Sequence, residues 1–116
     1  LLERENNMQR KELGKINSAS FGMGGYQDAC IGLNLSFGGK GWGVCKFYGS
    51  WAIARSEYAK WFQDDRLREI GLAGMKLAEL LEKTHKRDVS QLVGTPVECT
   101  FEGNELKEWR LLEEVL

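Results

Sequence analysis

The chain has 116 residues, of which 42% are hydrophobic and 28% charged, and its net charge is -1. This length predicts one domain with a single two-layer core. The near-neutral charge argues against the long-range attraction that gathers nucleic acid, so a nucleic-acid accessory protein ranks third among our hypotheses. No apolar run approaches the roughly 20 residues of a membrane span, and no signal-peptide core is visible. With three cysteines in unpaired spacing, we expect a cytoplasmic protein.

The N-terminal residues 1–13 are polar and show no functional motif. We expect them to form an extension that is disordered or helical, followed by one α+β domain over residues 14–116. Met8 is the expected natural start, which would make the seven residues before it an upstream remnant.

Two strands are predicted before the first hairpin turn, because apolar and polar residues alternate there. The string KINSASF predicts a strand over Lys15–Phe21. A second strand is predicted over Gln27–Phe37. One of its faces carries the aliphatic and aromatic residues Ile31, Leu33, Leu35 and Phe37.

Gly38 and Gly39 are expected to supply the positive φ angles of the hairpin turn after this strand. Pairing across the turn joins odd positions before it to even positions after it, so Trp42 and Val44 share the face of Leu33. The opposite face gathers small residues and one ring, namely Cys30, Gly32, Gly43, Cys45, Phe47 and Gly49. A face lined by glycine predicts close approach by a neighbouring backbone or by a ligand.

A long amphipathic helix is predicted from the apolar residues that recur every three or four positions after residue 56. Ser56 is its expected N-cap, and it ends near His85, which we interpret as a cap rather than a general base. Gly71 and Gly74 each cost this helix about 1 kcal/mol relative to alanine. They lie one turn apart, and we expect them to allow close packing on the sheet.

The C-terminal residues predict a short helical turn and a second hairpin. Asp88-Val-Ser-Gln91 is a capping box that begins a turn over Val89–Val93, and Gly94 ends it. Val97, Cys99 and Phe101 then share one face of a strand, a turn follows at Gly103-Asn104, and a strand returns over Leu106–Leu112, with a helix as the alternative for that segment. The order βββ, α, ββ predicts an α+β fold: an antiparallel sheet with one long helix packed on one face.

Catalytic and metal-binding patterns are not found at recognisable spacing. Cys30, Cys45, Cys99 and His85 lack the short spacings of zinc sites, so we expect no metal and no cofactor. No Ser-His-Asp, Cys-His or paired carboxylate arrangement is evident, and we expect that the protein is not an enzyme.

A first candidate binding group combines Tyr26, Gln27 and Asp28 with Lys40 and Trp42 at the hairpin. Aromatic faces stack on bases, Asp and Gln bind base edges or ribose, and Lys meets phosphate. The alternative is structural: Trp42 belongs to the core, while Tyr26 and Asp28 fix the turn.

A second candidate group lies on the terminal hairpin, where Trp109 and Arg110 stand near Asn104. Arginine offers a planar fork for phosphate, and the adjacent Trp109 would anchor it from the other face of the strand. The alternative is a salt bridge from Arg110 to a carboxylate of the helix. Since small domains commonly build ligand pockets between subunits, we also expect a homo-oligomer.

The run FGMGGYQDACIGL at residues 21–33, with GKGWGV at 39–44, resembles a family of small uncharacterised proteins encoded in phages and prophages. The segments LVGTPVE at 92–98 and TFEGN at 100–104, with Trp109-Arg110, resemble the C-terminal half of that family. Cys30 and Cys45 depart from its pattern, so we assign no chemistry to these thiols. The resemblance implies a role in antagonising host defence.

Our leading hypothesis is a phage-borne, non-enzymatic counter-defence sponge that sequesters a nucleotide-like immune signalling molecule in the host cytoplasm. Its expected ligand-binding residues are Tyr26, Gln27, Asp28, Lys40, Trp42, Asn104, Trp109 and Arg110. The alternative is a protein inhibitor of a host defence effector or nuclease, similar in role to an anti-CRISPR protein. That alternative predicts an exposed apolar patch.

Overall fold

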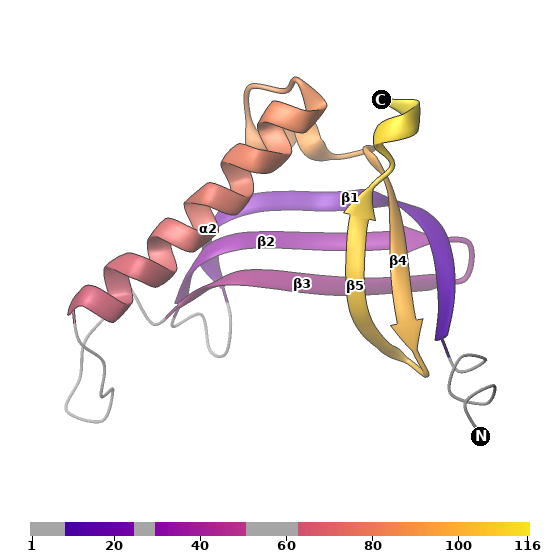
Figure 1. The fold of residues 1–116 in the computed structure, drawn as a ribbon, viewed down its shortest axis with the longest axis horizontal. Coiled ribbons are helices and arrows are strands. Elements are labelled where there is room, and N and C mark those ends of the chain that lie inside the picture. The colour runs from indigo at the N-terminus through magenta and orange to yellow at the C-terminus, as the bar shows by residue number, and fades with distance from the viewer. Residues whose placement is uncertain (1–8, 25–29, 51–62) are drawn as a thin grey trace.

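The computed structural model describes residues 9–24, 30–50 and 63–116. The elements in chain order are the strands β1 (Gln9–Gly24), β2 (Cys30–Gly39) and β3 (Trp42–Ser50), the helix α2 (Gln63–Thr84), the 3-10 helix η2 (Val89–Leu92), the strands β4 (Pro96–Glu102) and β5 (Glu105–Leu111), and the 3-10 helix η3 (Glu113–Val115) (Figure 1). The predicted α+β class, with antiparallel strands and one long helix, is confirmed.

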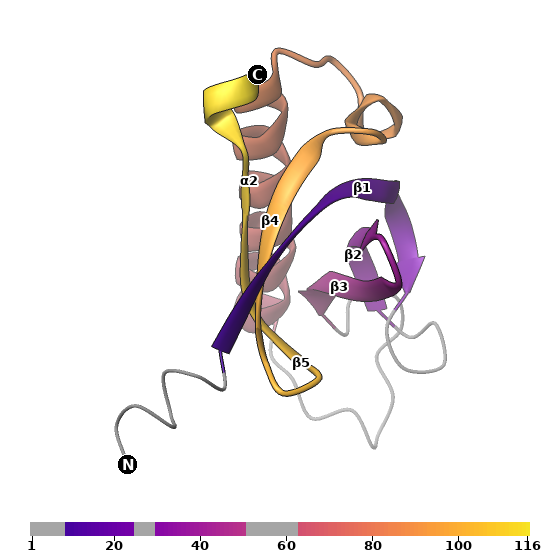
Figure 2. The ribbon, with the colours of Figure 1, turned by 90° about the vertical axis from the view of Figure 1, so that its right-hand side faces the viewer.

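The five strands form one antiparallel sheet in the order β3-β2-β1-β4-β5. Its central strand, β1, pairs with β4 along Gln9–Lys15 and with β2 along Lys15–Gly24. A register shift between Ile16 and Ser18 falls where β1 passes from one partner to the other, and such a bulge bends a strand. The sheet therefore curls, and the β4–β5 hairpin, with the first half of β1 beside it, crosses the direction of β2, β3 and the second half of β1 (Figures 1 and 2).

The core lies inside the curl and beneath α2. Ring pairs join the two halves of the sheet: Phe37 packs on Trp109 with centroids 4.6 Å apart, and Trp42 packs edge-on against Phe101 at 5.4 Å. α2 contributes Leu80 to this cluster, so the helix packs on the inner face as predicted. The buried members are Ile16, Leu33, Leu35, Phe37, Leu80, Leu92, Val97, Cys99, Phe101 and Leu111.

The N-terminal boundary differs from the prediction, because β1 begins at Gln9. Residues 9–13 of the expected extension are strand, and residues 1–8 lie outside the described part of the chain. Arg10 explains why the pattern gave no strand signal: its guanidinium carbon lies 4.8 Å from the centroid of the Phe101 ring, and Nη1 donates to the Gly103 carbonyl. A cation–π contact thus replaces the apolar residue that alternation would require.

The first hairpin turn also lies two residues later than predicted. Gly38 and Gly39 belong to β2, and the turn is Lys40-Gly41, where Gly41 has φ 80°. A Cβ on Gly38 would overlap the Asn17 side chain, so this glycine permits close packing rather than a turn. The predicted pairing of odd positions before the turn with even positions after it is nevertheless confirmed, since Gly39 pairs with Trp42.

The glycine-rich outer face of the hairpin is filled by the chain itself. Gly32 pairs with Gly49, and a Cβ on Gly32 would overlap the Tyr48 carbonyl oxygen. A Cβ on Gly24 would come within 2.8 Å of the Phe47 ring, and one on Gly49 within 2.6 Å of it. Neighbouring backbone and the Phe47 ring therefore account for these glycines without a ligand.

The glycines of α2 behave in the opposite way. A Cβ on Gly71 or Gly74 would meet no atom within 4 Å in the described part of the chain. The expectation that they pack on the sheet is wrong, because α2 turns Ala73, Leu80 and Thr84 toward the interior instead. The predicted N-cap, Ser56, lies outside the described residues.

The C-terminal end of α2 and the beginning of η2 are capped at the predicted residues, His85 and Asp88. His85, with φ 57°, follows the last residue of α2, and its N–H donates to the Glu82 carbonyl at 3.3 Å. The Lys86 N–H donates to the Leu81 carbonyl at 3.0 Å, which completes a Schellman motif. Asp88 caps η2 by accepting from the Ser90 N–H at 2.9 Å, and this bond, with one from the Ser90 hydroxyl, lowers the pKa of the Asp88 carboxyl.

The terminal hairpin confirms the strand interpretation over the helical one. β4 and β5 pair around a turn at Gly103-Asn104, where Gly103 has φ 62°. Val97, Cys99 and Phe101 of β4 are all buried on one face, as their spacing predicted.

Candidate functional site

Two adjoining grooves lie on either side of Trp109, where β5 faces α2 and β3. The first, here called the α2 groove, has a volume of about 190 Å³. Its lining consists of Lys76, Glu79, Leu80, Lys83, Trp109, Arg110, Leu111 and Glu113. The second, here called the β3 groove, has a volume of about 230 Å³. It is lined by Lys46, Tyr48, Leu106, Lys107, Glu108 and Trp109.

Trp109 is held firmly between the grooves. One contact is the Phe37 ring, 4.6 Å away between centroids, and the indole Nε1–H donates to the Tyr48 hydroxyl at 2.7 Å. Burial raises the pKa of the Tyr48 phenol, with a further contribution from the nearby Glu79 carboxylate, while the bond from Trp109 lowers it. Tyr48 therefore stays neutral and keeps accepting from the indole at physiological pH.

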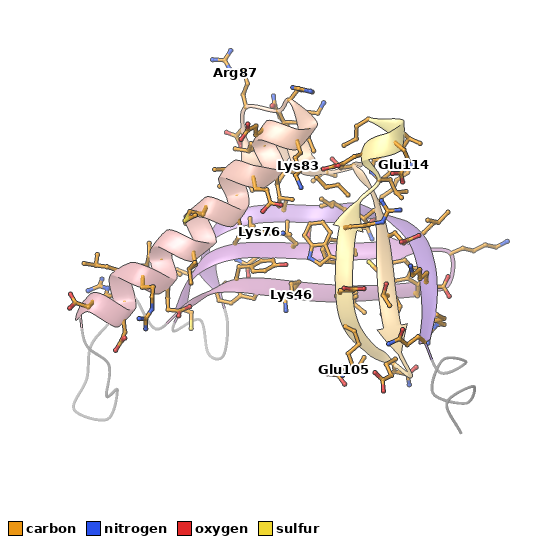
Figure 3. The ribbon with its side chains drawn as sticks, in the orientation of Figure 1. Lys46, Lys76, Lys83, Arg87, Glu105 and Glu114 are labelled. Carbon is orange, nitrogen blue, oxygen red and sulfur yellow. The ribbon has the colours of Figure 1, made fainter. Side chains whose placement is uncertain are left out.

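Two lysines approach these rings from different elements. The Nζ atom of Lys76 lies 5.1 Å from the centroid of the Trp109 ring and 5.7 Å from that of Tyr48. Lys46 brings its Nζ atom to 5.5 Å from the Tyr48 centroid. Figure 3 shows Lys76 on α2 and Lys46 on β3 in the space that β5 borders. Both ammonium groups are within the range of cation–π attraction.

The other end of the α2 groove holds cations that carboxylates already bind. Lys83 lies 3.2 Å from Glu79 and 3.2 Å from Glu113, and hydrogen bonds to both raise its pKa. Arg110 is likewise held by Glu114 and Glu98, and its pKa is raised by these hydrogen bonds.

The aromatic end is the more electropositive part of the two grooves. The Lys76 ammonium forms a salt bridge with the Glu79 carboxylate at the longer distance of 3.8 Å. Within the described residues, the recorded contact of Lys46 is the Tyr48 ring, with no carboxylate at salt-bridge distance. The positive charge beside Trp109 is therefore less fully paired with carboxylates than the charge of Lys83 and Arg110.

The structure brings together only part of the predicted binding set. Trp109 and Arg110 both line the α2 groove, whereas Asn104 is exposed at the β4–β5 turn. Tyr26, Gln27 and Asp28 lie outside the described residues. The structural alternative for Arg110, a salt bridge to a carboxylate, is present, but the partners Glu98 and Glu114 come from β4 and η3 and not from the long helix.

Lys40 and Trp42 lie apart from these grooves. Lys40 is exposed in the β2–β3 turn. The Trp42 ring packs edge-on against Phe101, and it also fills the space above Gly14 and Gly39, where a Cβ would come within 2.7 Å and 2.5 Å of its atoms. These contacts agree with the structural interpretation of Trp42.

Lys46, Tyr48 and Lys76 were missed by the sequence reasoning, although a signal was present. Lys46 is a charged residue on the inner, apolar face of its strand, between Val44 and Tyr48. Lys76 lies three residues after Ala73 and four before Leu80, on the buried side of α2. A lysine within an apolar stripe indicates a side chain that reaches past the core to a special contact.

The thiols lie outside the grooves. Cys45 is exposed, while Cys30 and Cys99 are buried. Burial, with the nearby Glu98 carboxylate, raises the pKa of the Cys99 thiol to about 11, which keeps it protonated. No three His, Cys, Asp or Glu side chains of the described residues converge as a metal site would require. Within the same residues, no helix has the length and apolarity to cross a membrane.

Comparison of the chain with protein-family models, with curated proteins and with solved structures returns no match.

Proposed function

We propose that this protein binds a small, anionic, nucleotide-like molecule without turning it over, in the grooves beside Trp109. The observation that supports the proposal is the position of Lys76, whose ammonium lies 5.1 Å from the centroid of the Trp109 ring and 5.7 Å from that of Tyr48, while the ammonium of Lys46 lies 5.5 Å from the Tyr48 centroid. Stacking surface and positive charge are thus combined within one site. This is the pairing of features that recognises a base and its phosphate.

In the expected binding event, a base of the ligand replaces the Lys76 ammonium as the contact of the Trp109 indole. A base that stacks on Trp109 displaces the Lys76 ammonium from the ring, and stacking of this kind contributes about 1–3 kcal/mol. The displaced ammonium and Lys46 then meet the phosphate groups. The net charge of -1 suits a short anion better than a polyanion, because a nearly neutral chain supplies no long-range attraction for a polyanion.

In the cell, the proposed role is sequestration of a nucleotide-like immune signal by a phage or prophage protein. The protein would act as a sponge, lowering the free concentration of the signal below the level that activates a host effector. Such a role requires tight binding, and it requires that the signal is recovered chemically unchanged.

The test is native mass spectrometry with a pool of linear and cyclic nucleotides, followed by calorimetry on each ligand that adds mass. Lys76→Ala and Lys46→Ala are expected to weaken binding at least tenfold. Lys11→Ala is the matched control, since it removes an exposed lysine of β1 without touching either groove. Equal affinity in all four proteins would contradict the site, and conversion of the bound nucleotide would contradict the non-enzymatic role.

A second candidate function, inhibition of a host defence effector or nuclease, is favoured by a different observation. Leu67, Leu72 and Met75 of α2 are 57%, 53% and 68% exposed. Gly71 and Gly74 lie between them and leave the helix backbone open to close approach. An apolar surface of this kind is typical of a protein-docking site.

The two functions are separated by matched variants. If a purified effector is inhibited, Met75→Glu is expected to abolish the inhibition and Lys76→Ala to leave it intact. Inhibition that survives Met75→Glu but not Lys76→Ala would assign the effect to the grooves instead.

A further inference from the structure

The sheet ends in two edge strands, β3 and β5, which differ sharply in how they are protected. β5 carries a charged residue at four of its seven positions: Glu105, Lys107, Glu108 and Arg110. β3 is nine residues long and has one charged residue, Lys46, with no proline. In its pairing with β2 no register shift interrupts the ladder. Natural edge strands are normally blunted by charge, proline or bulges, and β3 has almost none of these.

The free hydrogen-bonding groups of β3 follow from its hairpin. A two-residue turn makes its flanking pair, Gly39 and Trp42, a hydrogen-bonded pair, so even-numbered residues of β3 bond to β2. The odd-numbered residues direct their backbone N–H and C=O groups to the open edge. These residues are Gly43, Cys45, Phe47 and Gly49. Among the described residues no strand pairs with this edge.

We propose that β3 pairs antiparallel with β3 of a second copy of the chain, with Cys45 on the two-fold axis. The pairing would join the two five-stranded sheets into one continuous sheet. It depends on the edge alone and is independent of the proposed ligand. It also gives a surface for the homo-oligomer that the sequence led us to expect.

The register is fixed by side-chain contacts across the axis. With Cys45 opposite itself, Phe47 lies opposite Gly43 of the second copy, so that no side chain stands against the Phe47 ring across the new interface. Lys46 then lies opposite Val44 of the second copy. Moving the axis to residue 46 would place Lys46 opposite Lys46, and like charges directly opposite each other destabilise a sheet. Moving it to residue 44 would shorten the paired part of β3 to Trp42–Lys46.

A second copy of the chain fits this edge because its β3 presents the same outward backbone groups as β3 of the first copy. Gly43, Cys45 and Phe47 donate and accept on both sides of the axis, as an isologous contact requires. With a net charge of -1 per chain, long-range repulsion between copies is negligible. Lys46 and Tyr48 lie on the inner face of β3 and line the β3 groove. The pairing would therefore also place the β3 grooves of the two copies side by side.

The first experiment measures mass in solution by light scattering and native mass spectrometry, with the unmodified chain expected to be a dimer. Cys45→Asp puts two carboxylates together on the axis and is expected to raise the dissociation constant at least tenfold, because Cys45 is exposed and its replacement leaves the core intact. Cys45→Ser is the matched control and stays dimeric. Cys45→Pro, which removes the central outward N–H, is expected to be monomeric.

The position of the axis has its own test. Mixing the Cys45→Asp and Cys45→Lys variants is expected to restore the dimer as a mixed pair, since residue 45 of each copy faces residue 45 of the other. A short bis-maleimide should link two unmodified copies through Cys45. A Cys45→Ser/Lys107→Cys variant, whose thiol lies on the protected edge β5, should not be linked.

A monomeric unmodified chain, or a dimer indifferent to Cys45→Asp and Cys45→Pro, would overturn the proposal. The variants at Cys45 alone keep the two proposals separate, because Cys45 lines neither groove. Nucleotide binding by a monomeric Cys45→Asp variant would leave the ligand site standing, whereas a dimer that binds no nucleotide would leave the pairing standing.

Discussion

The glycines of the sheet and the glycines of α2 differ in the space around them. In the sheet, Gly32 of β2 has backbone atoms where a Cβ would stand, and Gly24 of β1 has the Phe47 ring there. In α2, a Cβ on Gly71 or Gly74 would find open space within the described structure. Packing therefore requires glycine at Gly32 and Gly24, whereas glycine in the helix costs stability and gains no contact there.

The largest expected effect comes from filling the tightest of these positions. Gly32→Ala should lower the free energy of unfolding by about 3 kcal/mol, because the added methyl meets the Tyr48 carbonyl and the Gly49 Cα, which are backbone atoms. Urea denaturation measures the change. Gly43→Ala is the control in the same sheet, since its Cβ would lie 3.6 Å from the Phe37 carbonyl oxygen, an ordinary contact. Equal losses in both variants would mean that strand propensity, not packing, sets the effect.

A smaller loss is expected where the obstacle is a side chain. Gly24→Ala should cost about 1.5 kcal/mol, because the Phe47 ring and the Asn34 carboxamide can both shift. In a Phe47→Leu background the cost should fall, and the double-mutant cycle measures that coupling. A cost unchanged by Phe47→Leu would show that the ring is not the obstacle.

The helix should respond with the opposite sign. Gly71→Ala and Gly74→Ala are each expected to raise the free energy of unfolding by about 1 kcal/mol, the difference in helix propensity between the two residues. Thermal and urea unfolding of the single and double variants test this, and the two gains should add. A loss of stability would reveal a close contact at that helix face.

The smallest effect concerns the end of α2. His85 adopts φ 57°, a left-handed conformation that glycine reaches without steric cost. His85→Gly should raise stability by about 0.5 kcal/mol, because relief of this conformation slightly exceeds the added flexibility of the unfolded chain. His85→Ala is the matched variant and should not stabilise.

Local patterns predicted most of the fold, and long-range contacts account for the differences. Alternation identified β2, β4 and β5, and three-to-four spacing identified α2, because these elements bury one face. The first half of β1 gave no such signal, since Arg10 covers Phe101 with a cation. Gly38 and Gly39 suggested a turn, but they are glycines because Asn17 and Trp42 occupy the adjacent space.

The candidate site was predicted only where its residues are neighbours in the chain. Trp109 and Arg110 are adjacent and were identified together. The other groove residues come from β3, which contributes Lys46 and Tyr48, and from α2, which contributes Lys76. They lie near Trp109 only because the sheet curls and α2 packs on its inner face. Spacing within one segment carries no information about such a meeting.

The shared strand β1 has a consequence for how the chain is made. Its first half pairs with β4, and the bond from Arg10 to the Gly103 carbonyl spans 93 residues. On a ribosome, this half of β1 leaves the exit tunnel long before its partner is synthesised, while the β2–β3 hairpin can already dock on the second half. Closing so large a loop is entropically costly and slow. Completion of the sheet, and with it the packing of Trp109 against Phe37, therefore waits until β4 and β5 have been synthesised.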